Sequence, residues 1–92
     1  METDEFEWDD DKATSNLKKH NIGFGAASFV FDDQNAVFTF DHTTDDGEER
    51  HKITGLVDGV VISVIFTERG ERIRIISARK ATRHEERDYH NI

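Results

Sequence analysis

The 92-residue chain contains no cysteine and no proline. Without cysteine, neither a disulfide framework nor a thiolate zinc site can form, so packing and hydrogen bonds must stabilise the fold. No linker-like stretch or internal repeat divides the chain, and we expect one domain spanning residues 1–92. The longest apolar run, Val60 to Phe66, is far shorter than the ~20 residues of a membrane-spanning helix. Because the acidic start also lacks the pattern of a secretory signal, we expect a cytoplasmic protein without a membrane partner.

Basic side chains are scarce as well. Twelve lysines and arginines face 20 aspartates and glutamates, which gives a net charge of -8. This charge alone argues against a nucleic-acid partner, because binding to a polyanion depends mainly on lysine and arginine. The charge is uneven, however: residues 1–11 hold seven acids and no base, whereas residues 69–83 hold Arg69, Arg72, Arg74, Arg79, Lys80 and Arg83 against Glu71 alone. A local basic field can therefore oppose the overall charge.

The chain is too short for more than one thin core, so each large apolar side chain is needed there. Seven phenylalanines, one tryptophan and one tyrosine are present. We therefore expect most aromatic side chains to be buried rather than to form a stacking platform for RNA. This expectation covers Phe6, Trp8, Phe29, Phe31, Phe38, Phe40 and Phe66.

The first third of the chain predicts a short strand and two helices. Phe6 to Trp8 alternates apolar and polar side chains, as a short strand does. Asp9 to Asp11 supply an N-cap and an acidic first turn for a helix that runs to His20. That helix would face the core with Ala13, Leu17 and His20. A second helix over residues 24–31 would face it with Phe24, Ala27, Val30 and Phe31.

From residue 36 the pattern has period two. It predicts strands over Ala36–Asp41, Glu49–Val57, Val60–Glu68 and Arg72–Ser77, with a hairpin turn at Asp58-Gly59. Thr82 and Glu85 match a capping box that begins a last helix, for which Tyr89, Ala81 and Ile92 are the available anchors. We expect an α+β domain in which two N-terminal helices pack on one face of an antiparallel sheet and a short C-terminal helix ends the chain. The other face of the sheet would be open to a ligand.

Two stretches carry a resemblance to a known family. They are WDDDKATSNLKKHNIGFGAASFVFDD at residues 8–33 and GERIRIISARKATRHEERDY at residues 70–89, with Glu49-Arg50 and Gly55 between them. In this order they are similar to the BrnT family of bacterial type II toxin-antitoxin systems. The chain departs from the family at residues 21–23 and at Gly25, where the family tends to have glycine and acidic residues, and in its unusually acidic start.

The resemblance implies the compact RelE-like toxin fold and an endoribonuclease activity that inhibits translation without a metal or other cofactor. It also implies a BrnA-type antitoxin that neutralises the toxin and lets the complex repress its own promoter. DNA would then be contacted only through the antitoxin. A dimer within the toxin-antitoxin complex is a further expectation.

Metal-free RNA cleavage requires a base, an acid and cations fixed around the phosphate. Arginine suits the cationic role because its planar guanidinium can hold two phosphate oxygens. Arg72 and Arg74 are two apart on one predicted strand and share a face, and Arg79 follows at the strand end. Arg50 lies on a strand that can neighbour them. The alternative is that these arginines form the solvated side of an amphipathic strand, and that Arg50 pairs with the adjacent Glu48 or Glu49.

The acid and base are sought among His20, His51, His84 and Glu68, because histidine titrates near neutrality. His20 ends the first helix, where the helix dipole favours its protonated form, although His20 and Lys19 can equally serve only to complement that dipole. His51 lies on the strand face opposite Arg50. The candidate catalytic residues are Arg50, Arg74, Arg79, His20 and Glu68. The candidate RNA-binding residues are Lys19, Arg72, Lys80, Arg83, Arg87 and Tyr89.

The sequence also allows a metal site and a function without catalysis to be considered. The acidic run Asp9 to Asp11, with Asp45 and Asp46, lacks the spacing of a calcium loop and is better explained by helix capping, so no metal site is expected. The rival function is a catalytically silent module that acts only as the antitoxin's partner in a repressor complex. The net charge of -8 suits a protein that meets a basic DNA-binding partner.

Overall fold

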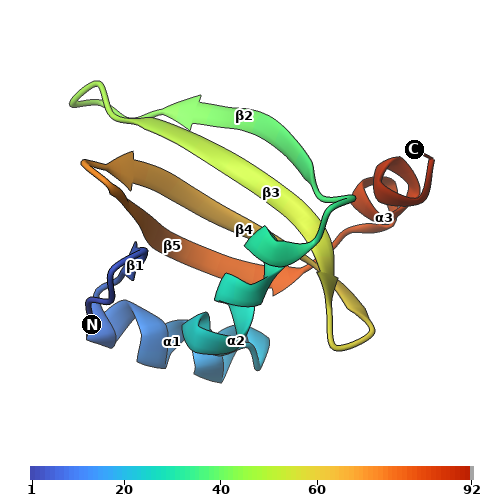
Figure 1. The fold of residues 1–92 in the computed structure, drawn as a ribbon, viewed down its shortest axis with the longest axis horizontal. Helices are drawn as coiled ribbons and strands as arrows, with labels where there is room; N and C mark the ends of the chain where they lie inside the picture. Colours follow the sequence, from blue (N-terminus) through green and yellow to red (C-terminus); the bar gives the residue numbers. More distant parts are fainter. Residues whose placement is uncertain (92) are drawn as a thin grey trace.

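The computed structural model describes residues 1–91, and its centre is a curved sheet flanked by short helices (Figure 1). The strands are β1 (Phe6–Glu7), β2 (Val37–Thr43), β3 (Glu49–Val57), β4 (Val60–Arg69) and β5 (Arg72–Lys80). The helices are α1 (Asp10–His20), α2 (Phe24–Ala27), the 3-10 helix η1 (Ser28–Asp32) and α3 (Arg83–His90). Ile92, which we expected to anchor the last helix, lies outside the described residues.

The sheet has the strand order β1-β5-β4-β3-β2. The antiparallel meander from β2 to β5 confirms the strands predicted from residue 36 onward, although β5 continues to Lys80 rather than ending at Ser77. The expectation of a wholly antiparallel sheet is wrong, because β1 pairs with β5 in parallel, with Phe6 opposite Ile73. A two-residue strand carries no pattern from which its direction could be predicted.

Helix α1 begins as predicted but buries a different side chain. Asp9 caps it by accepting hydrogen bonds from the backbone N–H groups of Asp11 and Lys12 at 2.9 and 3.1 Å. Leu17 was expected in the core, yet it is 50 % exposed while Asn16 is 7 % exposed. The buried side of α1 therefore carries a polar side chain, because this helix lies against β5 and contacts the backbone of that strand.

Asn16 completes an edge of β5. Its side-chain Oδ1 accepts a hydrogen bond from the backbone N–H of Ala78 at 3.1 Å, and its Nδ2 donates to the carbonyl of Ala78 at 2.9 Å. The same Nδ2 donates to the carbonyl of Ile22 at 3.0 Å. The amide thus offers β5 the donor and acceptor that a neighbouring strand would have offered.

The predicted second helix is a turn of α-helix followed by η1, rather than one continuous element. Its core side is as predicted, since Phe24, Ala27 and Val30 are buried. Gly55 on β3 allows the close approach of η1, because a Cβ there would lie 2.9 Å from Val30 Cγ2 and 3.0 Å from Asp33 Oδ2. This contact is a packing reason for the glycine noted between the two sequence motifs.

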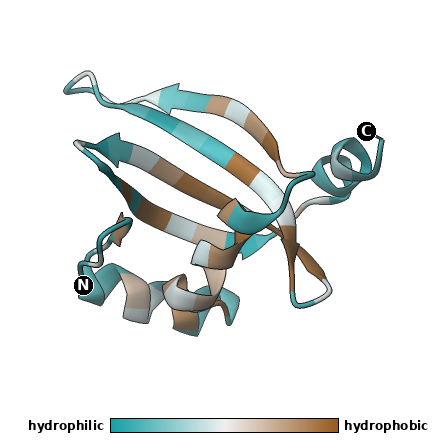
Figure 2. Ribbon diagram, in the orientation of Figure 1, coloured by the Kyte–Doolittle hydropathy of each residue, from teal (hydrophilic) through white to brown (hydrophobic). Residues whose placement is uncertain are grey.

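The two faces of the sheet differ in chemistry. We call the one that packs on α1, α2 and η1 the helical face; its central row is Ile53, Val64 and Ala78, which pair across β3, β4 and β5. The opposite, polar face carries the row Thr54, Ser63 and Arg79. Figure 2 shows apolar residues in the middle of the sheet and hydrophilic ones at the β2–β3 turn and along α3.

Helix α3 lies apart from α1 and α2 (Figure 1). The predicted capping box is confirmed, with Thr82 and Glu85 each bonding to the other's backbone N–H. Tyr89 is buried, and its hydroxyl donates to Asp33 at 2.6 Å, while the same carboxylate accepts from the backbone N–H of Leu56 at 2.8 Å. Asp33 therefore ties α3 to β3. None of the helices described is long and apolar enough to cross a membrane.

The prediction that the aromatic side chains form the core is correct only in part. Phe66 is buried, and Phe6, Trp8 and Phe31 pack against the core. Phe29, Phe38 and Phe40 are instead 63, 62 and 59 % exposed. For the two on β2 the reason is position, because β2 is an edge strand that extends past the part of the sheet covered by helices.

Candidate functional site

A β-bulge brings Arg74 and Arg79 to the same face. Arg79 follows Arg74 by five positions, so strict alternation would put their side chains on opposite faces. The pairing of β4 with β5 shifts between Ile65 and Phe66, so that Arg74 lies opposite Thr67 and Arg79 opposite Ser63. Both partners belong to the polar face, because they lie an even number of positions apart on β4. The bulge therefore gathers the two candidate arginines on one surface.

Arg50 does not neighbour Arg74 and Arg79 as expected. It lies on β3, and β4 separates β3 from β5. Its guanidinium pairs with Glu48 at 3.1 Å, which agrees with the local pairing considered from the sequence. Arg69 pairs with the same carboxylate at 3.1 Å.

The other candidate arginines of β5 are also paired. Arg74 donates to Glu7 on β1 at 2.7 Å, so the acidic N-terminal segment lies against the basic strand. Arg72 donates to the carbonyl of Thr3 at 2.7 Å and lies 3.9 Å from Glu2. The uneven charge of the sequence is thus partly neutralised within the fold.

Glu85 is the centre of a cluster of ion pairs and hydrogen bonds on the polar face. It receives two hydrogen bonds from Arg79, at 2.6 and 3.0 Å, and an ion pair from Lys52 at 2.7 Å. The backbone N–H of Thr82 donates to it at 2.9 Å, so the cap of α3 fixes the carboxylate in place. Although Glu85 is only 7 % exposed, two cations surround it, and its burial is therefore compensated.

Arg79 and Glu85 both remain charged at neutral pH. The hydrogen bonds from Arg79 lower the pKa of Glu85 far below its ordinary value, with burial opposing and Lys52 adding to the shift. The same hydrogen bonds raise the pKa of Arg79, against the opposing effect of burial. Glu85 therefore stays ionised and can position cations but cannot act as a general acid at neutral pH.

A hollow of about 270 Å³ opens beside this cluster, between α3 and the sheet. Lys52, Glu85 and His84 line it, together with Asp88, whose Oδ2 lies 3.4 Å from His84 Nε2. His84 is thus the acid or base candidate that the fold places beside the cations. Lys52 was missed from the sequence, although it follows Arg50 by two positions on one strand and alternation puts it on the same face.

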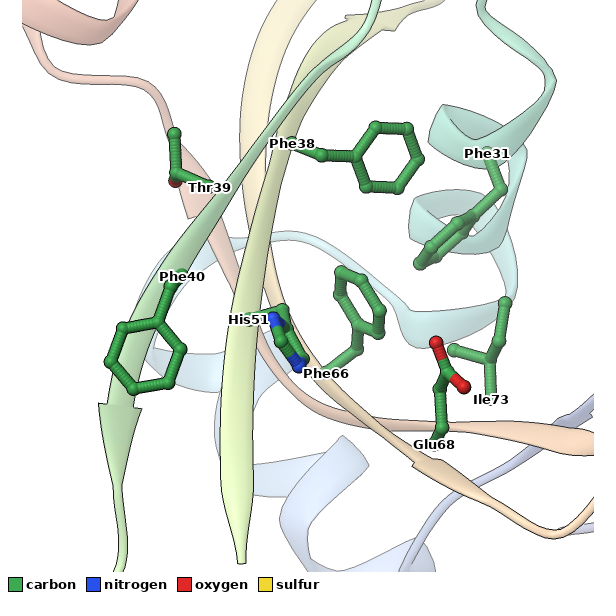
Figure 3. A pocket seen from close by; sticks show the side chains of 8 residues that line it. All are labelled: Phe31, Phe38, Thr39, Phe40, His51, Phe66, Glu68 and Ile73. Carbon is green, nitrogen blue, oxygen red and sulfur yellow. The ribbon is translucent and has the colours of Figure 1, made fainter.

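The remaining acid and base candidates lie elsewhere. His20 and Lys19 line a separate hollow with Asn16 beside α1. Glu68 and His51 line a groove on the helical face, where Figure 3 shows them among phenylalanine side chains. The fold therefore does not bring His20 or Glu68 to the arginines.

The candidate RNA-binding residues are similarly dispersed. Lys80 is exposed at the end of β5. Arg83 and Arg87 are exposed on α3, whereas Tyr89 of the same helix is buried against Asp33. Among residues 1–91, no three histidine, aspartate or glutamate side chains gather as a metal site would require.

These features define a small α+β domain whose open sheet face carries arginine and lysine tied to a buried carboxylate. Residues 8–85 match the family described as the ribonuclease toxin, BrnT, of type II toxin-antitoxin systems, and the chain belongs to this family. The resemblance found in the two sequence stretches is thereby confirmed. The family's description supports ribonuclease activity in general and implies a cognate antitoxin. A comparison with the curated proteins found no match.

Proposed function

We propose that this chain is a RelE-like toxin that cleaves RNA without a metal, inhibits translation in the cytoplasm and is neutralised by a BrnA-type antitoxin. The family supports the general activity. The observation that carries the choice of site is the Lys52–Glu85–Arg79 cluster beside a hollow that also holds a histidine.

In the proposed reaction, Arg79 and Lys52 bind the non-bridging oxygens of one phosphate. The guanidinium offers two parallel donors and the ammonium a point charge, and both stabilise the charge of the phosphorane. Glu85 is a positioning residue, because it lines the hollow together with Lys52 and pairs with both Lys52 and Arg79. No metal is needed for this part of the chemistry, since the side chains supply the positive charge.

His84 is the proposed base. It removes the proton of the ribose 2′-hydroxyl, the 2′-oxygen attacks phosphorus, and the bond from phosphorus to the 5′-oxygen breaks. The leaving oxygen takes a proton from the Lys52 ammonium, and the products are a 2′,3′-cyclic phosphate and a 5′-hydroxyl. Asp88 orients the imidazole through the contact of 3.4 Å.

The test is RNA cleavage by the purified, antitoxin-free chain in EDTA. We expect the unmodified chain to release 2′,3′-cyclic phosphates, and Arg79→Ala to lower the rate by about 10²- to 10³-fold, as the loss of one oxyanion donor does. Arg69→Ala is the matched control, because it also removes an ion-paired arginine but lies at the far end of β4. Equal losses in both variants, or products with a 5′-phosphate that require magnesium, would contradict the proposal.

The silent-module alternative retains one specific support. Arg50, Arg74 and Arg79 are each paired with a carboxylate, so a phosphate must compete with charges already present. A cell-free translation assay separates the ribonuclease from the silent module, because cleavage that depends on the ribosome would also inhibit translation in this assay. An antitoxin-free chain that neither cleaves RNA nor inhibits translation, yet binds its antitoxin, would favour the silent module.

A further inference from the structure

An aromatic groove lies at the end of the helical face that the helices leave uncovered. Phe31, Phe38, Phe40 and Phe66 line a hollow of about 360 Å³ there (Figure 3). Phe66 forms its floor, with the ring centroids of Phe31 and Phe38 at 5.0 and 6.3 Å from its own. Two of the walls, Phe38 and Phe40, are 62 and 59 % exposed on an edge strand. Such a surface promotes aggregation unless a partner covers it.

The rim of this groove is acidic. The carboxylate of Glu68 lies beside Phe66 and Ile73 in Figure 3. Glu49 lines an adjoining hollow together with Glu68 and His51. Within residues 1–91, neither Glu49 nor Glu68 makes an ion pair, in contrast to Glu48, which pairs with two arginines. The groove therefore offers an apolar floor with carboxylates available at its border.

This charge pattern selects the occupant. Phosphates are repelled by the rim, which argues against RNA bases stacking on the exposed rings. A second copy of the chain is also disfavoured, because each copy carries a net charge of -8. We infer that the groove binds a segment of the cognate antitoxin with aliphatic or aromatic side chains and at least one lysine or arginine. The inference rests on the proposed function only in assuming that such an antitoxin binds the chain.

The groove is connected to the proposed catalytic hollow through two neighbouring residues of β2. Thr39 and Phe40 line both the groove and the hollow that holds Lys52, Glu85 and His84. An antitoxin segment seated in the groove can therefore continue over the edge strand β2 toward the catalytic hollow. Binding at the aromatic groove would in this way place antitoxin residues where RNA has to enter.

The test is titration of the purified chain with its purified cognate antitoxin, with variants chosen in matched pairs. Phe38→Ser should weaken binding by about thirtyfold, the effect of losing a central aromatic contact. Phe29→Ser is the control and should bind normally, because Phe29 is equally exposed, at 63 %, but does not line the groove. Glu68→Lys should weaken binding about tenfold, more at low salt than at high salt, whereas Glu71→Lys in the exposed β4–β5 turn should not.

RNA cleavage by Phe38→Ser separates the inference from the proposed function. Weaker antitoxin binding with normal cleavage supports the groove as the antitoxin site. Normal antitoxin binding by Phe38→Ser overturns it, and reduced cleavage alongside that normal binding would identify the groove as an RNA surface instead. Equal weakening by Phe29→Ser also overturns it. If the unmodified chain does not cleave RNA at all, the proposed function fails, while the binding result still decides the role of the groove.

Discussion

The two faces of the sheet are held together by different forces. On the helical face, Phe24 of α2 and the strand residues Ile53 and Val64 are buried among apolar neighbours. On the polar face, Arg74 and Arg79 are held by carboxylates at 2.7 and 2.6 Å. Apolar burial contributes to folding in proportion to area, whereas ion pairs lose much of their attraction to desolvation. The helical face should therefore carry stability, and the polar face should carry chemistry.

The largest expected effect comes from opening the helical face. Phe24→Ala should lower the free energy of unfolding by about 3–5 kcal/mol, because the ring is 2 % exposed and its loss leaves a cavity. Denaturant titration followed by circular dichroism measures the change. Phe29→Ala removes the same ring from a site that is 63 % exposed and should cost far less. Equal losses would mean that the helical face is not the main source of stability.

The second effect concerns the polar contact between Asn16 of α1 and the edge of β5. Asn16→Ala should lower the free energy of unfolding by about 2–3 kcal/mol, because it leaves the N–H and carbonyl of Ala78 without their partners. The exposed neighbour in Ser15→Ala should change it by under about 0.5 kcal/mol. Amide hydrogen exchange at Ala78 gives an independent measurement, since it should accelerate in Asn16→Ala alone. Unchanged exchange there would show that the side chain does not protect the edge of β5.

The third effect is the pH dependence of stability that the polar face causes. The pKa of Glu85 is lowered mainly by hydrogen bonds from Arg79, so the stability it contributes is present above the ordinary value of 4.5 and is lost as the pH falls below it. Glu85→Gln should remove this part of the acid dependence while keeping the shape of the side chain. Glu86→Gln, on the exposed side of α3, should retain it. The measurement is the free energy of unfolding from neutral to acid pH in all three proteins.

Much of the fold on both faces could be predicted from local sequence. The alternation of apolar and polar residues predicted the meander, and the capping box predicted the start of α3, because both patterns depend on residues close together in the chain. The burial of Asn16 could not be predicted, since its partner Ala78 is distant in sequence. The shared face of Arg74 and Arg79 depends on a bulge that alternation cannot show. The exposure of Phe38 follows from its place on an edge strand, which only the assembled sheet defines.

The smallest effect on stability is expected at Arg74, and it gives the sharpest contrast between the faces. Its pair with Glu7 is partly solvated, at 23 and 15 % side-chain exposure, so a double-mutant cycle of Arg74→Ala and Glu7→Ala should give a coupling of roughly 1 kcal/mol or less. If the polar face binds RNA, Arg74→Ala should nevertheless weaken RNA binding and reduce its salt dependence, because one phosphate contact is lost. Glu7→Ala should strengthen RNA binding, since it removes the competing carboxylate. Opposite effects on RNA binding with similar, small effects on stability would assign the arginine to function; a large coupling with no change in RNA binding would assign the pair to the fold.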